Sequence, residues 1–180
     1  LSGTATVSGS GTLSLTSAAN QTIAGGVTLV LSASGTEAPT LSFGAGAGAL
    51  DVNGTIRASW TSGPKPTVTG AVAGEADLNL LGGTVDITGL AFSNGPADGL
   101  LVGQNGTTNC TITAFREVDF TLAAAGSRHL TVIAQAPYSL LAEDCTFDAT
   151  YLPGGANVRV DKNLGTIDPS RPVRPPQRSS

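Results

Sequence analysis

The sequence predicts an all-β solenoid in which one chain of short strands winds into about eight coils, followed by an extended tail. Three observations lead to this prediction: a strand-like phrase that recurs along the chain, a shortage of bulky core residues, and weak helix signals throughout. A chain of 180 residues suits one domain, which we place at 1–168, with the tail at 169–180.

The recurring phrase alternates apolar and small polar residues, as in a half-buried strand. It is clearest at 110–114 (CTITA), 130–134 (LTVIA) and 145–149 (CTFDA). Insertions in turns cost little entropy, whereas a one-residue slip inside a strand exchanges its faces, so we expect one phrase per coil and turns of unequal length. The central apolar residues, at intervals of 15 to 25 residues, are expected to stack in one inward file: Leu13, Leu29, Val52, Val68, Ile87, Ile112, Val132 and Phe147.

The composition favours a narrow core. Met is absent, Gly occurs 24 times, and there are one Trp, two Tyr and five Phe. Gly, Thr, Ser and Val form helices poorly, and the best helical candidate, TLAAAG at 121–126, is too short to stand alone. A second series of strand-like runs gives each coil at least two strands, with three in the longer coils. These runs lie at 100–102, 118–120, 139–141 and 158–160.

Three phrases resemble right-handed parallel β-helix proteins of the pectin-lyase type: ALDVNGTI at 49–56, ITGLAF at 87–92 and YSLLAEDCTF at 138–147. The resemblance covers about residues 10–165 and implies a right-handed parallel β-helix. Because this architecture carries lyases, hydrolases, phage tailspikes, adhesins and fibres, it does not fix an activity.

Charge and hydropathy exclude two partners. Charged residues make up only 12% of the chain and the net charge is −4, which does not fit a nucleic-acid interface. No stretch is long and apolar enough to predict a membrane span. The chain begins at Leu1 and lacks Met, which we interpret as a secreted, extracellular or cell-surface product whose leader has been removed.

The tail differs from the rest of the chain. All 13 acidic residues but only six of the nine basic ones lie before residue 169, and the tail holds four Pro. Such a segment cannot enter a sheet and is expected to be extended. We expect the cationic arm to dock on the anionic body of a neighbouring copy through Arg171, Arg174 and Arg178.

Candidate catalytic groups are few. A glycosidase needs two facing carboxylates; Asp119 and Asp148 are the best pair, flanked by Glu143-Asp144, but strand acids usually face water. The single histidine, His129, is expected in a solvent-facing turn. A lyase base would have to be Lys65 or Lys162, and neither lies in an acidic cluster. We predict a protein that is not an enzyme and that has no cofactor and no metal site.

Cys110 and Cys145 occupy equivalent positions in their phrases, with Leu130 at the same position between them. One phrase per coil places them two coils apart, roughly 10 Å, too far for a disulfide. Free thiols are therefore favoured, and a bridge follows if 129–134 is an excursion. N-glycosylation sequons occur at Asn20, Asn53, Asn105 and Asn109.

The leading functional prediction is a structural subunit that stacks end to end with copies of itself into an extracellular filament or surface fibre. A β-helix ends in open sheet edges, and no capping helix is predicted. The first alternative is a polysaccharide-binding or depolymerising domain of an adhesin or tailspike, which would use aromatic residues such as Trp60, Tyr138 and Tyr151.

The second alternative is an ice-binding solenoid, since Thr-x-Thr occurs at 4–6, 67–69 and 111–113. The one-phrase-per-coil alignment interrupts this array at Asp51/Asn53 and Asp86/Thr88.

Overall fold

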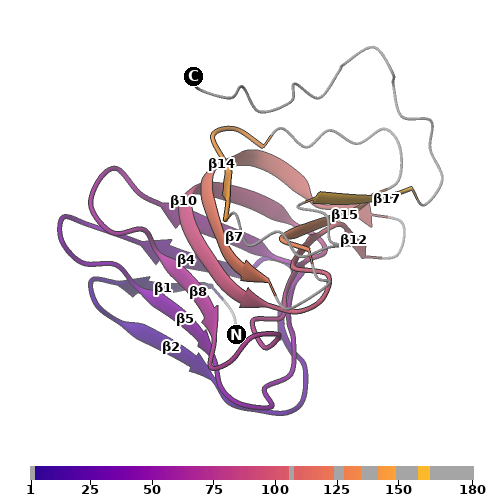
Figure 1. Ribbon diagram of the computed structural model, residues 1–180, viewed down its shortest axis with the longest axis horizontal. Helices are drawn as coiled ribbons and strands as arrows, with labels where there is room; N and C mark the ends of the chain where they lie inside the picture. The colour runs from indigo at the N-terminus through magenta and orange to yellow at the C-terminus, as the bar shows by residue number, and fades with distance from the viewer. Residues whose placement is uncertain (1–2, 106–107, 124–127, 135–141, 149–157, 163–180) are drawn as a thin grey trace.

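The chain is a parallel β-solenoid, seen in a computed structural model that describes residues 3–105, 108–123, 128–134, 142–148 and 158–162 (Figure 1). Within these ranges there is no helix. Each complete coil crosses three faces, and parallel pairing joins the equivalent strands of successive coils. The all-β solenoid prediction is confirmed.

The first two faces form one sheet, because β10 (Thr84–Gly95) and β14 (Thr111–Ala123) run through the corner between them. The other strands of the first face are β1 (Thr4–Ser8), β4 (Thr28–Ser32) and β7 (Thr55–Ser59). Those of the second face are β2 (Thr12–Leu15), β5 (Thr40–Phe43), β8 (Thr67–Gly70) and β16 (Thr146–Phe147).

The third face is a separate six-stranded sheet. Its strands are β3 (Gln21–Ile23), β6 (Leu50–Val52), β9 (Leu78–Leu80), β11 (Leu100–Val102), β15 (Leu130–Ala134) and β17 (Val158–Lys162). A short antiparallel pair, β12 (Gln104–Asn105) and β13 (Thr108–Asn109), lies between β11 and β14 in the chain.

The predicted number of eight coils is wrong. The chain crosses the first face at β1, β4, β7, β10 and β14, which makes about four complete coils, and β15 to β17 continue the stack. Paired residues on this face, such as Thr4 with Thr28 and Thr55 with Thr84, lie 24 to 29 positions apart. The shorter predicted period arose because all three faces use the same strand phrase, so phrases from different faces were counted as separate coils.

The predicted single file is distributed over the three faces. Val68 and Phe147 lie on the second face, Val52 and Val132 on the third, and Ile87 and Ile112 on the first, all in or against one apolar core. The registered files are different sets. On the second face, one inward file runs Leu13, Leu41, Val68, Phe92, Phe120, Phe147.

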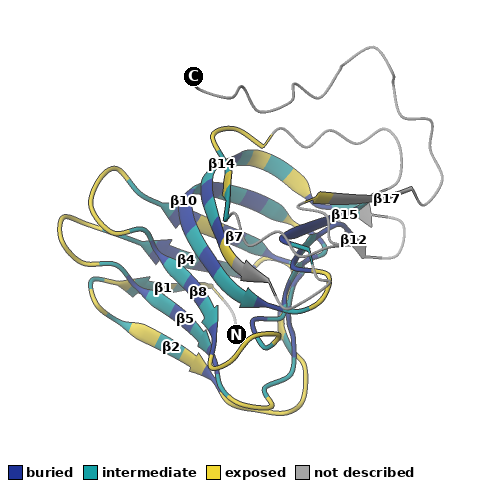
Figure 2. Ribbon diagram, viewed as in Figure 1, coloured by how far each residue is buried: buried dark blue, intermediate teal, exposed yellow. Residues whose placement is uncertain are grey.

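Burial follows the strand alternation: inward residues are buried in most strands, and outward residues are partly or fully exposed (Figure 2). Leu41, Val68 and Ile56 are fully buried. The aromatic end of the second-face file packs ring on ring, with centroids 6.0 Å apart for Phe92–Phe120 and 5.1 Å for the stacked Phe120–Phe147. The narrow core therefore reaches close packing by files of like residues.

One left-handed residue turns β10 from the first face to the second. Gly89 has φ 74°, and its partner position in β14 is Glu117 with φ 57°. In the preceding coil this corner is a longer excursion that begins at Trp60. A Cβ at Gly89 would lie 2.4 Å from the Trp60 Cβ, so only glycine fits beneath this side chain.

The first prediction tests the assignment of faces. Leu41→Ala should destabilise the protein by about 2–5 kcal/mol, because it opens a cavity in a buried file. Ser42→Ala, the next residue and outward-facing, should change stability by less than about 0.5 kcal/mol. Urea unfolding followed by circular dichroism measures both, and equal losses would contradict the alternation.

Candidate interaction surfaces

A continuous file of threonines runs along the outside of the first face. Parallel pairing joins its members directly, coil after coil. This ladder is not apparent when phrases from different faces are aligned as one series, because its members recur only at a period of 24 to 29 residues. The file consists of Thr4, Thr28, Thr55, Thr84 and Thr111.

The second face carries hydroxyl pairs in three consecutive coils, and we call this set the hydroxyl face. Each pair is a Thr followed two residues later by Ser or Thr, so strand geometry spaces the hydroxyls roughly 6.6 Å along a strand and 4.8 Å between coils. The interruption expected from the sequence is therefore wrong for these coils. The hydroxyl face comprises Thr12, Ser14, Thr40, Ser42, Thr67 and Thr69.

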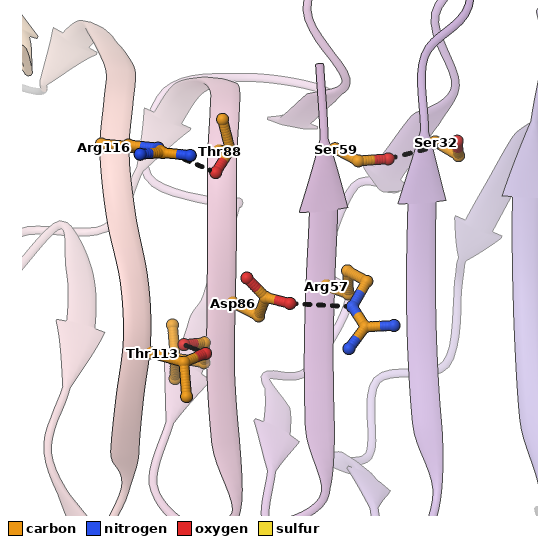
Figure 3. Close-up of polar contacts among 8 residues, drawn as sticks. Ser32, Arg57, Ser59, Asp86, Thr88, Thr113 and Arg116 are labelled. Carbon is orange, nitrogen blue, oxygen red and sulfur yellow. Dashed lines mark hydrogen bonds and ion pairs between the residues drawn. The ribbon is translucent and has the colours of Figure 1, made fainter. Parts of the chain in front are cut away.

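The later coils of the first face carry polar contacts between neighbouring strands (Figure 3). Ser59 Oγ donates to Ser32 Oγ at 3.2 Å, and Arg57 Nε to Asp86 Oδ2 at 2.9 Å. The Arg57 side chain is 54% exposed, so this ion pair contributes less than about 1 kcal/mol. These contacts hold outward side chains against the adjacent coil.

The two candidate carboxylates lie beside different basic side chains. Asp119 Oδ2 lies 2.7 Å from Lys65 Nζ, and its Oδ1 accepts a hydrogen bond from Thr146 at 2.7 Å. Asp148 Oδ1 instead lies 3.9 Å from His129 Nε2. Among the described residues, no group of three or more His, Cys, Asp or Glu side chains is arranged to hold a metal ion.

The Trp60 side chain is fixed by contacts with other residues of this chain. Its Nε1 donates to the Gly63 carbonyl at 2.8 Å, Lys65 Nζ lies 5.1 Å from the ring centroid, and the side chain covers Gly89. These contacts use the indole N–H and part of its surface for packing. Tyr138 and Tyr151, the other aromatic residues considered for a polysaccharide site, lie outside the described residues.

The expectation that His129 faces solvent is wrong. Its side chain is 6% exposed and lies edge-on to Phe120 and Phe147, at centroid distances of 6.2 and 5.6 Å. Neither ring nitrogen has a hydrogen-bond partner. The sequence gives no signal for this burial, because His129 is polar, follows Arg128 and lies just before the third-face strand that begins at Leu130.

Neither cysteine forms a disulfide, as favoured from the sequence. They do not occupy equivalent positions: Cys110 is buried before the first-face part of β14, whereas Cys145 is half-buried before β16 on the second face. Burial raises the pKa of the Cys145 thiol, and a backbone hydrogen bond from Val118 opposes this only in part.

The predicted tail contacts and sequons are only partly covered by the described residues. Arg171, Arg174 and Arg178, like the whole tail, lie outside the described residues. Of the sequon residues, Asn20 accepts a hydrogen bond from the Ala49 amide at 3.2 Å, linking two coils. The described residues include no helix that could span a membrane.

No protein-family model matches the chain, and searches of curated proteins and of solved structures also returned no match. Function is therefore inferred from the surfaces of this chain alone.

The second prediction concerns the thiols. In the folded protein at pH 8, Cys145 should react with Ellman's reagent several-fold more slowly than in urea, because its raised pKa lowers the thiolate fraction. Its rate should climb as pH rises from 8 to 10. Cys145→Ser leaves only buried Cys110 and should show almost no native reaction. Fast reaction of that variant, or a bridged mass for the intact protein, would contradict this assignment.

Proposed function

We propose that this chain is a structural subunit that stacks end to end with copies of itself into an extracellular filament or surface fibre. The observation that carries the proposal is the incomplete burial of the first coil. The inward residues Val7 and Leu13 are half-buried, whereas their partners in the next coil, Leu31 and Leu41, are fully buried. One further coil would cover this end of the core.

The edge of the first coil also offers backbone hydrogen bonds. Within the described residues, β1, β2 and β3 each pair with a strand on one side only. Such edges are templates for further pairing. At the opposite end Val158, in the file of Leu130, is 42% exposed. The two ends differ, so a head-to-tail contact between copies is heterologous, and it generates an open filament when its rotation does not close a ring.

Two finer features belong to the same proposal. The winding is right-handed, in keeping with the resemblance to pectin-lyase-type β-helices, and the arm with Arg171, Arg174 and Arg178 contacts a neighbouring copy. The charge difference between arm and body supports the contact.

The third prediction tests the edge. Leu13→Lys should abolish filaments, because its ammonium group reaches water at a free end but would be buried in a stack. Ser14→Lys, on the same strand but facing outward, should assemble normally. Electron microscopy detects filaments, light scattering gives the mass, and circular dichroism checks that both variants fold.

Isolated rods of the unsubstituted protein at high concentration would contradict the proposal, as would normal filaments from Leu13→Lys. Removal of 169–180 should weaken assembly; unchanged assembly would exclude the arm from the contact.

Ice binding is a second candidate, favoured by the hydroxyl face. Its six residues form a regular, uncharged array of hydroxyl and methyl groups over β2, β5 and β8. A periodic array of this kind suits an ordered lattice of water. The polysaccharide alternative gains no comparable support, because Trp60 is used in packing.

The fourth prediction separates this candidate from the first. If the hydroxyl face binds ice, the protein shows thermal hysteresis and inhibits ice recrystallisation, and Thr40→Lys abolishes both by placing a charge at the centre of the array. Thr84→Lys, in the threonine file of the first face, should keep both activities. The absence of ice shaping by the unsubstituted protein would exclude this function.

A further inference from the structure

The core contains an unpartnered imidazole at its aromatic end. His129, the only histidine of the chain, is 6% exposed, and both of its ring nitrogens lack hydrogen-bond partners. Buried polar groups are nearly always satisfied, so an unsatisfied one needs a physical explanation. Phe120 and Phe147 surround the ring edge-on and offer it no acceptor.

A carboxylate lies just beyond hydrogen-bond distance of this ring. Asp148 Oδ1 is 3.9 Å from His129 Nε2, whereas a charged N–H···O bond measures about 2.7–2.9 Å. The two residues belong to different coils: His129 precedes β15, and Asp148 follows β16. The Asp148 amide donates to the Phe120 carbonyl at 2.9 Å, so Asp148 sits where β16 pairs with β14.

Arg128 is the charged residue next to His129 in the sequence, and its Nη1 lies 2.8 Å from Asp98 Oδ1. The guanidinium therefore has its own counter-ion. Asp148 is the carboxylate that faces the imidazole.

We propose that His129 and Asp148 form a proton-dependent clasp between β16 and the coil beneath it. Imidazole is the side chain that ordinarily changes charge between pH 5 and 8. A proton taken from solvent at Nε2 makes a charged donor, and closure of about 1 Å brings it to bonding distance of Asp148. Mild acid then fastens β16 to β14, and loss of the proton releases the clasp. The clasp does not depend on end-to-end assembly.

Amide exchange in the full chain tests the clasp. As pH falls from 8 to 5, protection of the Phe147 and Asp148 amides, corrected for intrinsic exchange rates, should rise several-fold. A slowly exchanging, downfield imidazolium N–H resonance should appear, and it is unambiguous because the chain has one histidine. Asp148→Asn should remove both effects, whereas Asp86→Asn, whose carboxylate binds Arg57, should keep them.

His129→Phe should show no pH dependence of protection at β16; if this variant fails to fold, the Asp148→Asn comparison decides alone. Protection that is constant or falls on acidification overturns the clasp, because burial of the charge would then outweigh its pairing. An imidazolium resonance that persists in Asp148→Asn overturns it as well.

Discussion

Parallel backbone pairing between successive coils is the constraint on which this structure depends. Each interior strand both donates hydrogen bonds to and accepts them from the coils before and after it, so the polar backbone is satisfied with few large side chains. Pairing also fixes register, and a slip of one residue would exchange the inward Leu41 with the outward Ser42. Small residues and narrow core files suffice to hold the fold together, because backbone hydrogen bonds to adjacent coils fix the position of each strand.

The sequence predicts the strands well because this constraint acts locally. Apolar and small polar residues alternate in nearly every strand, so the all-β solenoid could be inferred without knowledge of the turns. The length of the coil could not. Val68 on the second face and Ile87 on the first lie in similar phrases, each followed by Thr and Gly, because each strand meets the same core from its own side. Only pairing partners such as Thr28 and Thr55 distinguish the faces.

The candidate sites also differ in whether local sequence patterns or contacts between coils determine them. The threonine file and the hydroxyl face follow from alternation once the coil length is known, but the shorter coil expected from the sequence concealed both. The burial of His129 and the ion pair of Lys65 with Asp119 depend on which residues of separate coils come together across the corner. Lys65 and Asp119 lie far more than 15 positions apart in the sequence, so local patterns contain no signal for their ion pair.

The constraint that stabilises the middle of the solenoid also determines where it can interact. In the interior, every coil is covered above and below, and Leu41 is fully buried there; at the first coil Leu13 in the same file has a neighbour on one side only. The outward files repeat at the strand spacing whatever residues occupy them. The uncharged hydroxyl face therefore forms a regular array, whereas Arg57 and Asp86 on the first face pair with each other. In the proposed function the ends bind copies of the chain, and in the second candidate function the hydroxyl face binds an ordered lattice of water.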